Sequence, residues 1–275
     1  MDSGLRDKVV LITGGAGGMG KAAAARFLEE GAIVYIADLD AERAAAAAAD
    51  LIASGLVAKL TAEPGRGPAL HASALDITRP DDVERTIADL MAVEGHLDVL
   101  VNAAGLWVEG PAESMTEDDW DRVVDVNLKG SFFCCSRAVP HLKQTQGCIV
   151  NISSDCGLVG TPGTSVYSAS KGGVVALTKA LAIELAPDLV RVNVICPADV
   201  MTPMLEGQAR EFGGGDENGY YRNLLTCYPQ CDSARFIEPE EVGELIVFLA
   251  SRPAAPITGA AVPIDFGTTA GYGYG

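Results

Sequence analysis

A glycine-rich run near the N-terminus constrains the fold more than any other part of this sequence. Residues 9–12 are apolar and largely β-branched, which is typical of a parallel strand buried on both faces. The stretch from Gly14 to Gly20 holds five glycines, and helix-forming residues begin at Lys21. Glycines let the backbone turn sharply and leave no side chain between it and a ligand. The run therefore predicts a strand, a tight turn and a helix whose N-terminus can bind a pyrophosphate group.

A second apolar run ends in an acidic residue at the distance that a dinucleotide site requires. Residues 32–37 predict another buried strand, and Asp38 follows them about 20 residues after Gly20. A carboxylate at this position binds the ribose hydroxyls in the adenosine half of a dinucleotide. The alternative is an ordinary tight turn followed by a surface Asp, but the two runs together favour the dinucleotide site.

Strand-like and helix-like segments alternate along the whole chain. Short apolar runs predict strands at 8–13, 32–37, 70–74, 97–101, 147–152, 190–196 and 261–265. Helical periodicity predicts helices at about 19–30, 41–54, 80–94, 116–143, 165–186 and 239–251. Such alternation is typical of right-handed βαβ units. We therefore expect one α/β domain over residues 1–275, a doubly wound Rossmann fold with helices on both faces of a seven-stranded parallel sheet.

Two stretches interrupt this alternation. Residues 55–69 contain several glycines and prolines, which predict a long loop before the third strand. Residues 198–236 have no readable period and follow the sixth strand. Since ligands bind beyond the carboxyl ends of such strands, we interpret this second stretch as an irregular substrate lid.

The composition excludes several classes of partner. The chain has 275 residues, of which 37 are acidic and 20 basic, and its net charge of −17 argues against nucleic acids and anionic membranes. No apolar run reaches the roughly 18 residues of a membrane span, and the polar first residues show no signal peptide. The seven cysteines mostly lie in apolar runs, which favours a reducing, cytoplasmic location and no metal site.

Four side chains have the chemistry of an acid/base site. Tyr167 and Lys171 lie one turn apart on the predicted helix 165–186; a nearby ammonium lowers the pKa of a phenol, although this spacing also occurs in ordinary surface pairs. Ser154 follows a strand and can donate to a substrate oxygen or simply form a turn. Asn127 interrupts the apolar stripe of helix 116–143, which begins at Trp120, so its amide needs a backbone or water partner.

The same residues match the motifs of the short-chain dehydrogenases/reductases, which this chain resembles over about residues 6–267. The matching motifs are Thr13-Gly14-x-x-x-Gly18-x-Gly20, Asn102-Ala103-Ala104-Gly105, Asn127, Ser154, Tyr167-x-x-x-Lys171 and, after the sixth strand, Pro197 and Thr202. The resemblance implies the strand order 3-2-1-4-5-6-7. It also implies hydride transfer between an alcohol and a nicotinamide without a metal.

The resemblance assigns a role to each of the four side chains. Tyr167 is expected to act as general acid/base on the substrate oxygen. Lys171 is expected to lower the pKa of Tyr167 and to bind the nicotinamide ribose. Ser154 is expected to orient the substrate oxygen, and Asn127 to position a water in a proton relay.

The cofactor site implied by the resemblance follows the strand ends. Its expected residues are Gly14, Gly18, Met19, Gly20, Asp38, Leu39, Asp76, Ile77, Asn102, Ala103, Gly105, Tyr167, Lys171, Pro197, Val200 and Thr202. Asp38 predicts NAD rather than NADP, because a carboxylate repels a 2′-phosphate, and Gly15 and Leu39 stand where relatives carry a cation. Ala198 departs from the glycine usual in the family, which puts the shape of the nicotinamide pocket in doubt.

The substrate is expected to be a secondary alcohol: a cyclic alcohol, a sugar or polyol, or a hydroxysteroid. The pocket is expected to include Trp107, Ser154, Cys156, Tyr167 and Met204, with Asp155 beside the serine. An NAD(P)H-dependent carbonyl or β-ketoacyl reductase is an alternative. A non-catalytic dinucleotide-sensing protein is another, which the four intact side chains disfavour.

A stripe of small residues along helix 165–186 permits another helix to approach closely. Its members are Ala169, Gly172, Gly173, Ala176 and Ala180. Together with the resemblance, this stripe predicts a homotetramer of D2 symmetry. The C-terminal tail, residues 268–275, either packs on a neighbouring subunit or frays.

Overall fold

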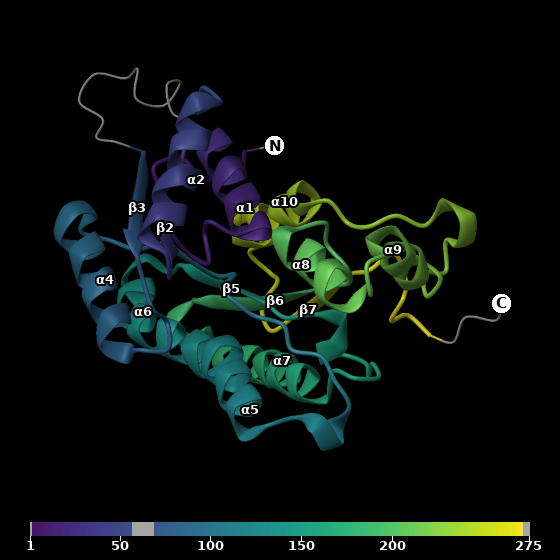
Figure 1. The fold of residues 1–275 in the computed structure, drawn as a ribbon. Coiled ribbons are helices and arrows are strands. Elements are labelled where there is room, and N and C mark those ends of the chain that lie inside the picture. Colours follow the sequence, from purple (N-terminus) through teal and green to yellow (C-terminus); the bar gives the residue numbers. More distant parts are fainter. Residues whose placement is uncertain (1, 57–68, 272–275) are drawn as a thin grey trace.

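A parallel sheet lies between two layers of helices (Figure 1). The structure is a computed structural model and describes residues 2–56 and 69–271. The strands are β1 (Val9–Thr13), β2 (Ile33–Asp38), β3 (Leu70–Ala74), β4 (Val99–Asn102), β5 (Cys148–Ile152), β6 (Arg191–Pro197) and β7 (Ala261–Ile264). They are ordered β3-β2-β1-β4-β5-β6-β7, all parallel, which confirms the expected doubly wound fold.

Each face of the sheet is covered by its own set of helices. One set is α1 (Gly18–Glu29), α2 (Ala41–Ala53) and α10 (Pro239–Ala250); the other is α4 (Pro80–Glu94), α6 (Ser131–Thr145) and α7 (Ser165–Leu185). Successive side chains of β1 divide between the two layers, because a strand presents alternate residues to opposite faces. Val10 and Ile12 pack in the first layer, and Val9 and Leu11 in the second.

The register of the strands aligns their carboxyl ends. Thr13, the last residue of β1, lies opposite Ala37 in β2 and Asn102 in β4. The chain leaves β1 toward β2 but reaches β4 only after β3, so the strand order reverses between β1 and β4. Such a reversal opens a crevice in which doubly wound sheets bind ligands.

The expected helix 116–143 consists of three pieces. They are α5 (Glu117–Val124), a π-helical turn η2 (Asp125–Gly130) and α6. Trp120 was expected in the buried stripe but is 48% exposed, so that expectation is wrong. The wide turn changes the angular phase between α5 and α6, so an α-helical stripe does not extend through both.

The expectation that residues 198–236 form an irregular lid is also wrong in its secondary structure. The segment contains α8 (Pro203–Phe212) and α9 (Glu217–Leu225), and it still follows β6. Leu205 and Ala209 anchor α8 by their burial. Most of the loop expected at 55–69, and the end of the tail at 272–275, lie outside the described residues.

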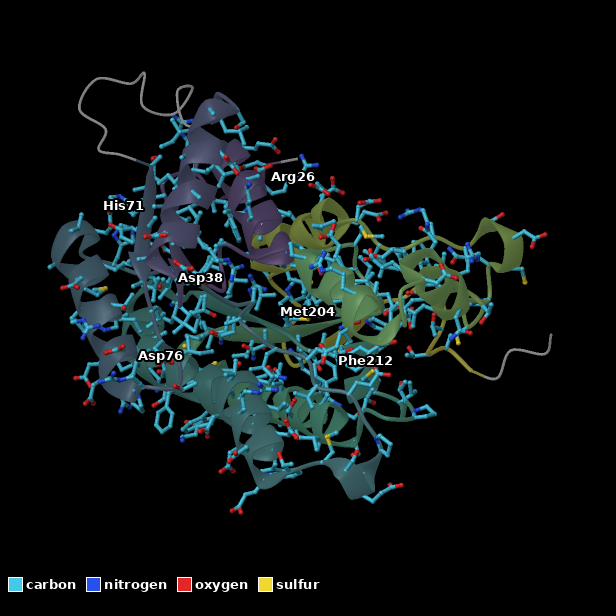
Figure 2. All side chains as sticks on the ribbon, in the orientation of Figure 1. Arg26, Asp38, His71, Asp76, Met204 and Phe212 are labelled. Carbon is cyan, nitrogen blue, oxygen red and sulfur yellow. The ribbon has the colours of Figure 1, made fainter. Side chains whose placement is uncertain are left out.

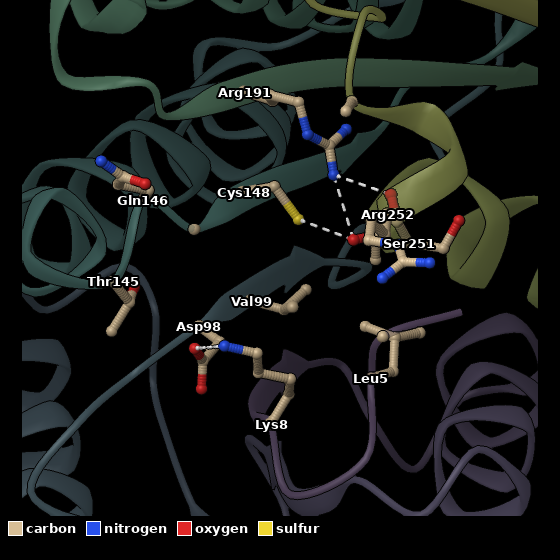
Figure 3. Close-up of a pocket in the computed structure, with 14 residues that line it drawn as sticks. Leu5, Lys8, Asp98, Val99, Thr145, Gln146, Cys148, Arg191, Ser251 and Arg252 are labelled. Atoms are coloured by element: carbon tan, nitrogen blue, oxygen red, sulfur yellow. Dashed lines mark hydrogen bonds and ion pairs between the residues drawn. The ribbon is translucent and has the colours of Figure 1, made fainter. Parts of the chain in front are cut away.

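A cavity opens at the edge of the sheet where the strands begin (Figure 3). Lys8 and Asp98 form an ion pair of 2.9 Å there, and Arg191 donates to the carbonyls of Leu249 and Ala250 that end α10. The Arg191 contacts join the sheet to α10. Because the strands are parallel, this edge is opposite their carboxyl ends. In the described part of the chain, no helix is long and apolar enough to cross a membrane.

Candidate active site

The glycine turn between β1 and α1 has no room for side chains. Gly14 adopts a φ of +64°, and a Cβ added there would lie 2.6 Å from the Cα of Ala104. A Cβ at Gly18 would lie 2.6 Å from Cγ2 of Thr202. No described side chain caps the N-terminus of α1, so its first N–H groups are available to an anion. The turn therefore fits the pyrophosphate of a dinucleotide.

Two buried polar atoms beside this turn have no hydrogen-bond partner among the described residues. They are Oγ1 of Thr13 at the end of β1 and Oδ1 of Asn102 at the end of β4. The amide nitrogen of Asn102 donates to Oδ1 of Asn151 at 2.9 Å. Since buried polar groups normally have partners, the two unpaired atoms fit a site that a bound cofactor completes. Ala103 and Gly105 continue the chain from this strand end.

Asp38 ends β2 beside the same turn. Its Oδ2 accepts the N–H of Ala16 at 3.2 Å, and the residue is 7% exposed, whereas Leu39 is 72% exposed. Nη1 of Arg43, on α2, lies 3.9 Å from Oδ1 of Asp38. The sequence analysis missed this cation; its place in the first turn of the helix after Asp38 was the available signal.

Asp76 and Ile77 lie in the loop that leaves β3, whose last residue, Ala74, lies opposite Asp38 at the end of β2; Figure 2 labels both aspartates. Oδ1 of Asp76 accepts the N–H of Thr78 at 3.0 Å and its hydroxyl at 2.6 Å, which fixes the loop. Ile77 is buried against the π-helical turn, where a Cβ on Gly130 would lie 2.8 Å from its Cδ1.

Asn127 lies in the π-helical turn, and its side chain binds backbone. Its Oδ1 accepts the N–H of Leu106 at 2.9 Å, and its Nδ2 donates to the carbonyl of Leu106 at 3.0 Å and to Oγ of Ser170 at 3.1 Å. A Cβ on Gly105 would lie 3.3 Å from both Oδ1 of Asn127 and Nζ of Lys171. Asn127 therefore joins the strand-end loop to the helix that carries Lys171. A water relay at Asn127 stays a prediction.

Tyr167 and Lys171 are both buried on α7, at 7% and 5% exposure. Nζ of Lys171 donates to the carbonyl of Ile152 at 3.0 Å and lies 5.7 Å from the centre of the Tyr167 ring. Burial lowers the pKa of Lys171 to about 8. The pKa of Tyr167 is raised, first by burial and next by the neighbouring Cys156. A hydrogen bond with Ser154 lowers this pKa in part. The depression expected from Lys171 does not prevail in this structure, because the phenol has lost its contact with water.

Ser154 and Trp107 both contact Tyr167. Oγ of Ser154 donates to Oδ1 of Asp155 at 2.7 Å and accepts the N–H of Cys156 at 3.2 Å. The rings of Trp107 and Tyr167 lie 4.3 Å apart, tilted by 55°. The side chains expected to bind substrate from these loops therefore meet the acid/base candidate, and the serine already has an acceptor beside it.

The segment after β6 approaches the glycine turn from the other side. Pro197 ends β6, Val200 is buried, and the hydroxyl of Thr202 donates to the carbonyl of Val200 at 3.2 Å. Met204, which Figure 2 labels on α8, is 39% exposed. Met19, in the first turn of α1, is half-buried and packs against the core.

Three carboxylates lie near Tyr167, and only one of them was expected there from the sequence. Asp199 follows β6. Burial and, after it, the nearby carboxylates of Asp155 and Glu109 raise the pKa of Asp199 to about 6, whereas a hydrogen bond from Tyr228 lowers it. Asp155 had been placed in the pocket wall, whereas Asp199 and Glu109 had not been singled out. Only contacts between distant parts of the chain bring them together.

Comparison with known proteins decides the family. The sequence model for short chain dehydrogenase matches residues 8–211. The chain belongs to the short-chain dehydrogenase family. A meso-2,3-butanediol dehydrogenase of Serratia marcescens is 40% identical over 267 residues, covering 97% of this chain and 96% of the relative. A 3-oxoacyl-acyl-carrier-protein reductase of Thermotoga maritima is 38% identical over 267 residues, covering 96% and 98%.

A solved structure extends the similarity to the fold. The 3-ketoacyl-acyl-carrier-protein reductase of Brucella melitensis complexed with NADH has a TM-score of 0.81 and 31% identity, covering 96% of this chain and 99% of that one. This short-chain dehydrogenase is therefore an oxidoreductase that uses a nicotinamide dinucleotide. In the described ranges, no group of three or more His, Cys, Asp or Glu is placed to hold a metal ion.

Proposed function

We propose that this short-chain dehydrogenase oxidises a secondary alcohol with NAD, with Tyr167 as the general base. One observation carries the proposal. Tyr167, Lys171 and Ser154 meet at the same end of the sheet as the glycine turn, and this turn fits a pyrophosphate. A bound nicotinamide supplies the acceptor for the hydride that leaves the carbinol carbon. Tyr167 takes the hydroxyl proton as the carbonyl forms, so one hydride and one proton leave the alcohol.

The other side chains position the substrate and the base. Ser154 orients the substrate oxygen by its hydroxyl, next to the phenol. Lys171 holds a positive charge near Tyr167, and at pH 7 its pKa of about 8 keeps it mostly protonated. Trp107 limits the space above the phenol through its ring contact. Asn127 holds the loop of Leu106 against α7, so the position of Tyr167 relative to the loop after β4 is fixed.

NAD rather than NADP is supported by Asp38. Its carboxylate accepts the N–H of Ala16 in the glycine turn, and a 2′-phosphate on a ribose bound there would meet a like charge. Purified protein given a panel of secondary alcohols should therefore reduce NAD with a kcat/KM at least about tenfold above that for NADP. NADH formation followed by absorbance measures this, and protein inactive on the whole panel would refute the proposed activity.

The cofactor preference can be reversed at two positions. Asp38→Ala combined with Leu39→Arg removes the repulsion and adds a cation beside Arg43, so the NADP/NAD ratio of kcat/KM should rise about 100-fold. Glu42→Gln is a matched control, since it removes one exposed negative charge from α2 and should leave the ratio unchanged. A wild-type preference for NADP would reject the assignment to NAD.

A β-ketoacyl reductase is the second candidate, because the Thermotoga and Brucella relatives carry that name. The net charge of −17 disfavours docking of an acidic carrier protein. This candidate would be favoured if the protein reduces acetoacetyl-CoA faster than any simple ketone, or oxidises 3-hydroxybutyryl-CoA faster than any simple alcohol.

We also propose that the protein is a homotetramer. Trp120 on α5 and Phe132 on α6 are 48% and 42% exposed, next to the small-residue stripe of α7, and large exposed apolar side chains mark interaction surfaces. Light scattering at micromolar concentration should give the mass of four chains. A monomer mass there would refute the proposal.

A further inference from the structure

The segment after β6 connects two parts of the candidate site. The residue before Ser154 donates its N–H to the carbonyl of Ile195 on β6 at 2.8 Å, so the serine lies beside the end of that strand. Farther along the chain, Thr202 reaches the glycine turn, where a Cβ on Gly18 would lie 2.6 Å from its Cγ2. Residues 198–201 therefore run from the serine to the cofactor turn, and their position affects how a substrate is placed.

A hydrogen bond in this segment depends on a side chain. Ala198 donates its N–H to a carbonyl on β7 at 3.1 Å, and Met201 donates to one just before α10 at 2.9 Å. The N–H of Asp199 instead donates to the hydroxyl of Tyr228 at 2.9 Å. The same hydroxyl donates to Oδ2 of Asp199 at 3.1 Å. One buried phenol thus holds both the backbone and the side chain of Asp199.

Tyr228 packs against the turn that follows β7. Its ring lies 6.3 Å from that of Phe266, tilted by 53°, and the guanidinium of Arg235 lies 4.8 Å from the centre of the Phe266 ring. Phe266 has a φ of +53°, which is costly for a large side chain and persists only where surrounding contacts impose it. Asp265 fixes this turn by accepting the N–H and the hydroxyl of Thr269 at 2.8 and 2.5 Å. The turn therefore supports the ring of Tyr228.

We propose that Tyr228 is a positioning residue, which holds Asp199 and with it residues 198–201 in the arrangement that binds substrate, and that Phe266 supports it. The proposal rests on the proposed function and adds a residue far from the acid/base pair in sequence. A hydroxyl suits this role, because a group that accepts one hydrogen bond and donates another is fixed in direction as well as distance. Since Asp199 is half-buried, water replaces a lost partner of its N–H only in part.

Tyr228→Phe tests the anchor, because it removes the hydroxyl and retains the ring beside Phe266. We expect the KM for the alcohol to rise about tenfold, with kcat and the Kd for NADH changed by no more than about twofold, because the contact of Thr202 with the glycine turn is kept. Hydrogen exchange of peptides that cover residues 198–201, measured by mass spectrometry, should become faster, since the N–H of Asp199 loses its acceptor.

Tyr35→Phe is the matched control for the chemical change. It also removes a hydroxyl that donates to a carboxylate, that of Glu94 at 2.7 Å, but it lies on β2. The KM for the alcohol and the exchange of residues 198–201 should both stay at the wild-type values.

Two further variants separate the anchor from the charge of Asp199. Asp199→Asn keeps the backbone N–H and an oxygen that accepts from Tyr228, so exchange should stay near wild type and KM should rise by no more than about twofold. Phe266→Ala removes the support of the phenol, so KM should rise about threefold and exchange should become faster, as in Tyr228→Phe.

The outcomes separate this proposal from the proposed function. Unchanged exchange in Tyr228→Phe overturns the anchor, whether or not the protein oxidises alcohols. Faster exchange with an unchanged KM overturns its role in substrate binding. A tenfold rise of KM in Asp199→Asn at wild-type exchange also overturns it, because the carboxylate rather than the held backbone would then act on the substrate. If the protein oxidises no alcohol, the proposed function fails, and the same KM comparison with acetoacetyl-CoA tests the anchor.

Discussion

Tyr167→Phe should lower kcat for alcohol oxidation by about 10³-fold while the dissociation constant for NADH changes little. The substitution removes only the phenolic oxygen, so the ring that packs against Trp107 is retained. Stopped-flow or steady-state absorbance measures the rate, and fluorescence titration measures NADH binding. Tyr35→Phe is the matched control, because the Tyr35 hydroxyl, on β2, donates to Glu94 at the end of α4.

The pH dependence provides a second readout of the same assignment. The phenolate is the base in oxidation, so the rate should rise as pH increases. Lys171 loses its charge through a pKa of about 8, and because its Nζ lies 5.7 Å from the centre of the Tyr167 ring the two groups titrate as a pair rather than separately. Tyr167→Phe should abolish the rise. Oxidation by this variant at more than a tenth of the wild-type rate would remove Tyr167 from its role.

Gly14→Ala should lower the free energy of unfolding by about 3 kcal/mol and weaken NADH binding about tenfold or more. The new methyl group is strained at a φ of +64° and would lie 2.6 Å from the backbone N and Cα of Ala104. Relief requires the turn to move away from the strand end that carries Asn102. Denaturant unfolding measures stability, and fluorescence titration measures binding.

Gly95→Ala separates conformational strain from the steric contact. Gly95 has a φ of +76° at the end of α4, but nothing lies within 4 Å of an added Cβ. Its substitution should therefore cost only about 1 kcal/mol and leave NADH binding unchanged. Equal losses of stability and affinity in the two variants would show that the contact with Ala104 is unimportant.

The sequence analysis succeeded where the signal is local. The strand at residues 9–13, the glycine turn and the helix after it depend on neighbours within a few residues, and the structure has them nearly at the expected bounds. The spacing of Tyr167 and Lys171 is likewise a property of one helix. The strand order was confirmed as well.

The failures have different physical causes. Trp120 was misplaced because a π-helical turn breaks the period on which the buried stripe was extrapolated. The helices of segment 198–236 were missed because Pro203 and the glycines at 213–215 hide the period of two short helical segments. The raised pKa of Tyr167 depends on burial by other parts of the chain, which one helix cannot reveal.

The amino-acid sequence by itself determined the strands, the glycine turn and the one-turn spacing of Tyr167 and Lys171, because backbone conformation and apolar periodicity act over short distances. Only the tertiary structure decided which charges surround that pair. Asp155, Glu109 and Asp199 are separated by tens of residues along the chain and meet only because parallel strands end at one edge of the sheet. Electrostatic interaction depends on distance in space, so the charge around Tyr167 and Lys171 follows from the fold.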